Sequence, residues 1–417
     1  MNKSIVLDKI SIKKQTLTYH FSVPESVKKY INPEYIDEQG NPFLFVEVPE
    51  KVKVDSIPEE ILTIPFVGTM IGVAMVCHTP IEVETIDSIY YRSLKEIGSV
   101  FNEMYPEGNL KLTVHARTIK ETKKQSKDGR TSVFFTGGVD ATSALVEVID
   151  RMPLLVNIVG GDIAISDQVA HEKLEAYFEE LRGNVNGLDF CFVKSNCRML
   201  FKEYDFDRVF KKFIKREQWW GYWASIAHIV VMTAIVAPVL YFENVTEHYI
   251  GSSHASQDDA FDGNNEKIVN AIRYGNCCFI SADANLDRND KVMKIVNYSK
   301  ETHKYFKLQV CWYKKAGENC CRCEKCYRTI MNILSAHGDP NKFGFKYDDQ
   351  TKNAMKKYLE TTPIKLSYWE TTQSVLKKEE EYWKNTDLAW FVDFKFNQPK
   401  TYFYKVINMV KAKVGTK

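Results

Sequence analysis

The fold is decided by residues 131–152, TSVFFTGGVDATSALVEVIDRM, in which a strand passes through two glycines into a helix. The run 131–135 is β-branched and aromatic, which is typical of a buried parallel strand. After Gly137 and Gly138 the apolar residues recur at helical spacing. This stretch therefore predicts a strand, a tight turn and a helix in direct succession.

The same alternation continues along the chain. Residues 154–161, LLVNIVGG, predict a second buried strand, residues 167–183 an amphipathic helix, and residues 188–196, LDFCFVKSN, a third strand. Strands and helices that alternate at short spacing predict a doubly wound parallel sheet. We expect an α/β protein in three parts, which are an α+β domain at 1–128, the doubly wound domain at 129–338 and a helical extension at 339–417.

The glycine turn, FTGGVDAT at 135–142, has the residue types that favour binding of an anion. Glycines let the backbone turn tightly and approach an anion closely, and the N–H groups at a helix N-terminus point at that anion. Thr136 and Thr142 would add hydroxyl donors. No Gly-Lys-Ser/Thr follows, so this is not a Walker A loop. The alternative is a simple helix start that Thr142 or Asp140 caps.

Four cysteines, Cys311, Cys320, Cys323 and Cys326, form a C-x8-C-x2-C-x2-C pattern. Tetrahedral zinc takes four thiolates at about 2.3 Å, and short C-x-x-C steps place thiolates on one tight loop. Cys321 competes with its neighbour Cys320, and the even spacing favours Cys320. An iron–sulfur cluster and reduced structural cysteines are the alternatives. The basic side chains that would offset the thiolate charge are Lys314, Lys315, Arg322, Lys325 and Arg328.

These two motifs resemble known families. The turn resembles the Ser-Gly-Gly-X-Asp-Ser signature of the PP-loop ATP pyrophosphatases, with Thr136 in place of the first serine and Ala141 in place of the last. The cysteine pattern, with NCCRCEKCYRTIMNI at 319–333, resembles the zinc element of the 7-cyano-7-deazaguanine synthases of the queuosine pathway. This resemblance covers residues 131–338, roughly half of the chain. The longer layout looks like the QueC-like proteins of bacterial defence or modification operons.

The resemblance implies which residues act on which ligand. PP-loop proteins cleave ATP between its α- and β-phosphates, adenylate a substrate oxygen and let a nucleophile displace AMP, with Mg²⁺ on the phosphates. Zn²⁺ would be structural. The expected ATP contacts are Thr136, Gly137, Gly138, Val139, Asp140, Thr142 and the turn Gly251, Ser252 and Ser253.

Two further side chains are candidates for the chemistry. Arg288, within DRND at 287–290, would stabilise charge on the leaving pyrophosphate or hold the substrate, beside Asp140 as the other catalytic residue. An ordinary ion pair of Arg288 with Asp287 or Asp290 is the alternative. Asp162 follows a predicted strand, where doubly wound sheets bind ligands, and is a candidate substrate contact.

Composition limits the partners and the compartment. Lys+Arg number 56 against 54 Asp+Glu, a net charge of +2 that argues against nucleic acid as the main partner. Ten cysteines without an evident secretory signal predict a reducing, cytoplasmic location. Residues 224–242 are apolar and long enough to span a bilayer, but His228, Pro238 and the turn that follows favour a buried helix that leads into a strand.

The sequence thus predicts a QueC-like ATP-dependent enzyme. It would adenylate a carboxylate or related oxygen of a deazapurine-like small molecule or a partner-linked substrate, with ammonia or an amine as the nucleophile. The extra parts would dock a protein partner or a protein substrate. The alternative is a partner-binding scaffold that keeps nucleotide and zinc for stability alone. Ala141 favours the scaffold, whereas Gly137, Gly138 and Asp140 favour the enzyme.

Overall fold

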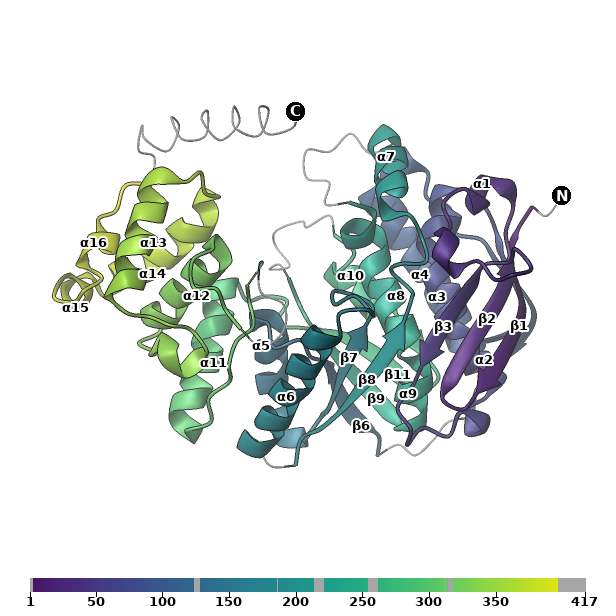
Figure 1. Cartoon of the computed structure of the whole chain (residues 1–417), viewed down its shortest axis with the longest axis horizontal. Helices are drawn as coiled ribbons and strands as arrows, with labels where there is room; N and C mark the ends of the chain where they lie inside the picture. The colour runs from purple at the N-terminus through teal and green to yellow at the C-terminus, as the bar shows by residue number, and fades with distance from the viewer. Residues whose placement is uncertain are drawn as a thin grey trace.

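One large sheet with helices on its faces forms the protein, which is described by a computed structural model (Figure 1). The structure describes residues 3–123, 128–185, 187–213, 221–253, 262–311, 313 and 318–396. Within these ranges eleven strands lie in the order β10-β11-β9-β6-β7-β8-β3-β2-β1-β4-β5. They are β1 (Ile5–Lys13), β2 (Thr16–Ser22), β3 (Phe43–Glu47), β4 (Ile81–Asp87), β5 (Val114–Lys120), β6 (Arg130–Phe134), β7 (Leu154–Val159), β8 (Asp189–Ser195), β9 (Val245–Gly251), β10 (Arg273–Tyr274) and β11 (Cys277–Ala282).

Five neighbouring strands at the centre of this sheet, β11, β9, β6, β7 and β8, run parallel. The chain passes from β6 to β7 and β8 on one side and then crosses back to β9, on the other side of β6. The strand order therefore reverses between β6 and β9. Ligands of open α/β sheets bind at the carboxyl ends of the strands beside such a reversal. The predicted α/β fold with a parallel sheet is confirmed.

Both faces of the central strands are covered because their side chains alternate between two cores. Val133 of β6 belongs to the core on one face, and the next residue, Phe134, packs against the core on the other. The first core is shared with α5 (Val139–Val148), α6 (Gln168–Asn184) and α11 (Arg288–Thr302). The second core is shared with α8 (His228–Ile235), α9 (Ala237–Phe242) and α10 (Glu266–Ala271).

The N-terminal strands extend this sheet. Strand β3 pairs antiparallel with β8, with Val46 opposite Ser195, so β1–β5 continue the central strands on one side (Figure 1). Their apolar side chains belong to the same core as those of α8 and α9. The helices of this part are α1 (Glu25–Lys28), α2 (Glu59–Leu62), α3 (Ile64–Val76) and α4 (Ser88–Met104), and α7 (Glu203–Phe213) follows β8.

Two helical stretches are apolar enough to cross a membrane by length and composition, and both lie inside the protein. They span Glu59–Val76 and Trp223–Phe242, and 94% and 78% of their apolar windows are buried. The second stretch leads directly into β9, as the sequence predicted. Both therefore have the burial of core helices in this α/β fold.

The C-terminal helices gather at the end of the molecule opposite the N-terminal strands (Figure 1). They share a core with α5, α6 and α11, and the Trp369 indole donates a hydrogen bond to Glu324 Oε1 at 3.3 Å. The predicted helical extension is therefore packed on the cysteine-bearing element, although residues 397–417 lie outside the described part of the chain. These helices are α12 (Glu324–Ser335), α13 (Asp349–Thr361), α14 (Leu366–Lys378), α15 (Glu380–Lys384) and α16 (Ala389–Val392).

Candidate functional site

A cavity of about 300 Å³ lies at the carboxyl ends of β6 and β7, beside the point where the strand order reverses. It brings together side chains from the glycine turn, the end of β7, α11 and α12. Thr136, Gly138, Val139, Asp140, Asp162 and Arg288, all singled out from the sequence, line it.

The glycine turn has the geometry expected of a strand that enters a helix. Gly137 has φ +75°, a left-handed conformation that favours glycine, and its carbonyl accepts a hydrogen bond from the Gln309 amide at 2.7 Å. Gly138 is the N-cap of α5, and its carbonyl accepts the first helical bond from Thr142 N at 2.9 Å. The backbone of the turn thus begins a ten-residue helix at the edge of the cavity.

The turn that ends β9 lies behind this helix start. A Cβ at Gly251 would stand 2.4 Å from the carbonyl carbon and oxygen of Asp140, so only glycine fits there. The buried Lys291 ammonium joins the two segments, because it donates to Ser252 O at 2.6 Å and lies 3.7 Å from Asp140 Oδ1. Burial lowers the pKa of Lys291, and the Asp140 carboxylate opposes that shift.

This close approach gives a stability prediction. Gly251→Ala is expected to lower the free energy of unfolding by about 1–3 kcal/mol, because the added carbon meets backbone atoms that cannot rotate away. Gly183→Ala is the matched control: no atom lies within 4 Å of its added Cβ, and alanine in α6 should stabilise by about 0.5–1 kcal/mol. Denaturant unfolding measures both. Equal stability of the two variants would contradict the close packing of Gly251 on Asp140.

Five of the sequence candidates lie outside the cavity lining, namely Gly137, Thr142, Gly251, Ser252 and Ser253. Thr142 is fully buried, and its hydroxyl has no hydrogen-bond partner among the described residues. Ser252 is buried, and its carbonyl oxygen accepts a hydrogen bond from the Lys291 ammonium. Ser253 is exposed, and its hydroxyl accepts a hydrogen bond from the Asn264 side chain at 2.9 Å. Their expected contacts with ATP remain predictions.

Arg288 stands at the start of α11 and reaches into the cavity. Asp287 and Asp290 form a capping box with each other. The guanidinium instead donates to Thr329 Oγ1 at 3.1 Å, and its buried Nε has no partner in the described part of the chain. Burial lowers the pKa of Arg288 to about 10. The surface ion pair that the sequence left open as an alternative is not formed among these residues.

The sequence did not identify three residues as part of the site, namely Lys291, Gln309 and Lys325. Lys291 follows Arg288 by three residues, and residues at this spacing lie on one face of a helix. This spacing is the sequence signal that could have identified Lys291 as a neighbour of Arg288. Lys325 lies between two of the cysteines, where its charge suggests a counter-ion to thiolates, yet it lines the cavity. Gln309 precedes Cys311 and gave no signal.

The end of β7 holds Asp162 in an ion pair. Arg198 Nη1 lies 3.1 Å from Asp162 Oδ1, and the Arg198 guanidinium stacks 4.9 Å over the Trp223 ring. Asp162 lines the cavity with a largely exposed side chain. Its carboxylate is thus within reach of a ligand and already neutralised by one arginine.

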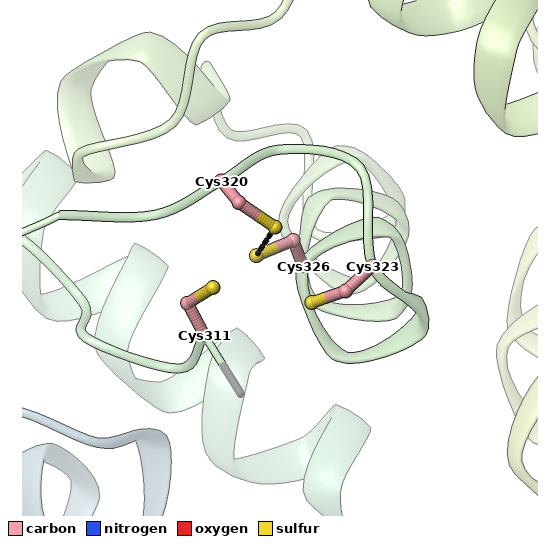
Figure 2. Close-up of side chains that lie close together, drawn as sticks. All are labelled: Cys311, Cys320, Cys323 and Cys326. Atoms are coloured by element: carbon pink, nitrogen blue, oxygen red, sulfur yellow. Dashed lines mark hydrogen bonds between the residues drawn. The ribbon is translucent and has the colours of Figure 1, made fainter. Parts of the chain in front are cut away.

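The side chains of the four cysteines in the sequence motif, Cys311, Cys320, Cys323 and Cys326, lie close together (Figure 2). Cys311 also lines the cavity. The four sulfur atoms all lie within 4.8 Å of one another, and those of Cys320 and Cys326 are 3.9 Å apart. Four thiolates around tetrahedral zinc stand about 3.8 Å apart for bonds of about 2.3 Å. The cluster could therefore bind a metal ion such as zinc.

Helix α12 sets part of this geometry, since Cys323 is its N-cap and Cys326 lies in its first turn. The pKa of the Cys326 thiol is raised, first by its hydrogen bond to Cys323 and then by burial. A divalent cation among the sulfurs would reverse this preference and favour thiolates. Cys321 takes no part: it has φ +51°, and its sulfur accepts from Lys346 N at 3.2 Å. The structure thus places Cys320, the cysteine that the even spacing favoured, in the thiol cluster.

The thiol cluster and the glycine turn are joined through one short segment. Gln309 N binds the Gly137 carbonyl, and two residues later Cys311 contributes its sulfur to the cluster. The Asn319 side chain fixes this segment, because it accepts from Val310 N at 3.1 Å and donates to Leu308 O at 2.6 Å. A metal among the thiols would therefore brace one wall of the cavity.

No protein-family model matches this chain, and a comparison with curated proteins finds no match either.

Proposed function

We propose that the cavity is the active site of a PP-loop-type, QueC-like enzyme that adenylates a carboxylate or related oxygen with ATP. The single observation that supports this most is the glycine turn and helix start at the reversal of strand order, inside a cavity that also holds two cationic side chains. Helix N-termini at such positions suit phosphate groups. The substrate class, a deazapurine acid or a protein-linked acid, follows from the sequence resemblance.

In the proposed reaction a substrate oxygen attacks the α-phosphorus of ATP. The bond from that phosphorus to the bridging oxygen breaks, and pyrophosphate leaves with the bond electrons. Ammonia or an amine then adds to the acyl carbon, AMP departs and the amine loses a proton. The backbone N–H groups of Gly138 and Val139 would hold phosphate oxygens, and Arg288 would stabilise the charge on the leaving pyrophosphate.

Two metal ions belong to this proposal. Mg²⁺ prefers oxygen ligands, and Asp140 is the carboxylate of the cavity that lies in the first turn of α5. When bound, Mg²⁺ would neutralise the polyphosphate. Zn²⁺ fits the Cys311, Cys320, Cys323 and Cys326 thiols, which hold the cavity wall and offer no evident open position. We place the protein in the cytoplasm with a protein partner or protein substrate, and without membrane or nucleic acid as main partners.

The test follows AMP and pyrophosphate release from ATP, with 7-carboxy-7-deazaguanine and with proteins encoded beside this one as candidate acceptors. Release that depends on an acceptor supports the enzyme. Intact ATP bound without release would favour the competing proposal, a scaffold that keeps nucleotide for stability. Ala141 is the observation behind that alternative, because it lines the cavity where the family signature has a hydroxyl.

Ala141→Ser separates the two proposals further. In an active enzyme the restored hydroxyl should raise AMP release by roughly 10- to 100-fold, since a hydrogen bond to a charged phosphate contributes about 1.5–3 kcal/mol. The hydroxyl of Thr142 is buried outside the cavity lining and does not duplicate it. Ala144→Ser, fully buried on the same helix, is the control and should give no gain. A lower rate in Ala141→Ser than in the parent protein would count against the phosphate contact.

A further inference from the structure

Lys325 is the feature of the cavity that the proposed function leaves without a role. It lies in the first turn of α12, between the cluster residues Cys323 and Cys326, and its side chain lines the cavity. Among the residues that the structure describes, its ammonium group makes neither a hydrogen bond nor an ion pair. Arg288 lines the same cavity, and its buried Nε is also without a partner there.

The carboxylates of the cavity do not balance these two cations. Asp140 lies 3.7 Å from the buried Lys291 ammonium, and Asp162 is paired with Arg198 at 3.1 Å. Arg328, whose guanidinium lies 4.1 Å over the Tyr368 ring, adds a further positive charge close to both. Asp140 attracts both cations and Asp162 attracts Lys325, but these carboxylates already face Lys291 and Arg198. Partly buried cations in excess over carboxylates are unfavourable unless an anion joins them.

We propose that Lys325 and Arg288 together form a subsite that binds an oxyanion of the ligand in this cavity. This inference rests on the proposed function in that it takes the cavity to be the ligand site. The oxyanion has two possible sources, a phosphate of the nucleotide or the carboxylate of the acid. Because Lys325 is carried by the cysteine-bearing turn, the thiol cluster is what positions this positive charge.

Calorimetric titration with inorganic pyrophosphate tests the subsite. Lys325→Met is expected to weaken pyrophosphate binding by about 10- to 100-fold, the range for loss of a hydrogen bond to a charged group. Lys325→Arg keeps the charge and should retain most of the affinity. The control is Lys357→Met, which removes an exposed lysine from α13 and should leave binding unchanged.

Thermal unfolding without ligand distinguishes a binding role of Lys325 from a structural one. If Lys325 stabilised the fold, its replacement would lower the unfolding temperature. Lys325→Met should unfold at the same or a higher temperature than the parent protein, because it removes a cation without a partner. Metal analysis of the same samples shows whether the cysteine cluster is intact. Arg288→Gln is the second variant if Lys325→Met does not fold, and it should lose affinity in the same range.

Two arms identify the source of the oxyanion. One titrates an ATP analogue with a methylene between the α- and β-phosphates, and the other titrates 7-carboxy-7-deazaguanine. Loss of affinity for either ligand in Lys325→Met supports the subsite and names its anion. Unchanged affinity for pyrophosphate and for both of these ligands, or an equal loss in Lys357→Met, would overturn it. These are binding measurements, so they stand even if the parent protein releases no AMP and the proposed function fails.

Discussion

Replacing Cys326 by serine is expected to remove the metal from the protein and to cause a large loss of stability. Cys326 is fully buried in the first turn of α12, and its sulfur is one of the four in the cluster. A structural zinc site contributes about 10–16 kcal/mol of apparent binding free energy in small zinc domains. If a third of this is lost with one ligand, the free energy of unfolding falls by about 3–5 kcal/mol.

Elemental analysis and denaturant unfolding measure the two effects. The unsubstituted protein should carry about one zinc per chain and Cys326→Ser far less. Cys321→Ser is the matched control, since that thiol lies in the same loop but turns its sulfur to the Lys346 amide. It should keep its zinc and most of its stability. A full zinc content in Cys326→Ser, or none in the unsubstituted protein, would remove the assignment.

Hydrogen exchange identifies the regions that the loss of the metal destabilises. The segment from Gln309 to Cys311 connects the cluster with the glycine turn, and α14 packs on α12 through Trp369 and Glu324. Amides in both regions should exchange faster in Cys326→Ser than in Cys321→Ser, because local opening follows the loss of local contacts. Strands β1 and β2, whose side chains belong to the other core, should change little.

The second large effect is expected on nucleotide binding. Gly138→Val should weaken ATP binding by roughly 100-fold or more, and Gly138→Ala by about 10-fold, because the added carbons occupy the place where a phosphate meets the backbone. The unliganded fold should tolerate alanine. Gly138 has φ −68°, and its added Cβ would meet only Thr136 Oγ1 at 3.4 Å and Gln309 O at 3.9 Å.

Gly137 supplies the contrast within the same turn. Its φ of +75° is strained for any other residue, and an added Cβ would lie 3.0 Å from the Tyr177 ring. Gly137→Ala should therefore lower the free energy of unfolding by about 1–2 kcal/mol, whereas Gly138→Ala should not. Calorimetry with ATP and thermal unfolding separate the two effects. ATP affinity that is unchanged in Gly138→Val would mean that the turn only begins a helix.

The sequence by itself determined the parts of this protein that depend on near neighbours. The run 131–135, the glycines and the helix after them follow from β-propensity, from backbone freedom and from apolar spacing, and the structure has β6, the turn and α5 there. The cysteine spacing likewise predicted which four thiols meet. Local structure of this kind depends on the types of consecutive residues, so one sequence suffices to predict it.

Only the tertiary structure decided which distant residues share the cavity. Lys325 suggests a counter-charge to thiolates, and Gln309 carries no signal, yet both border a turn more than a hundred residues earlier. Their positions follow from the return of the chain from β8 to β9, from the packing of α11 on α5 and from the packing of α12 on α11. The pairing of β3 with β8, which continues the sheet into the N-terminal strands, is of the same kind. Such contacts depend on strand order and on the packing of two cores, and these are properties of the whole chain that no local pattern records.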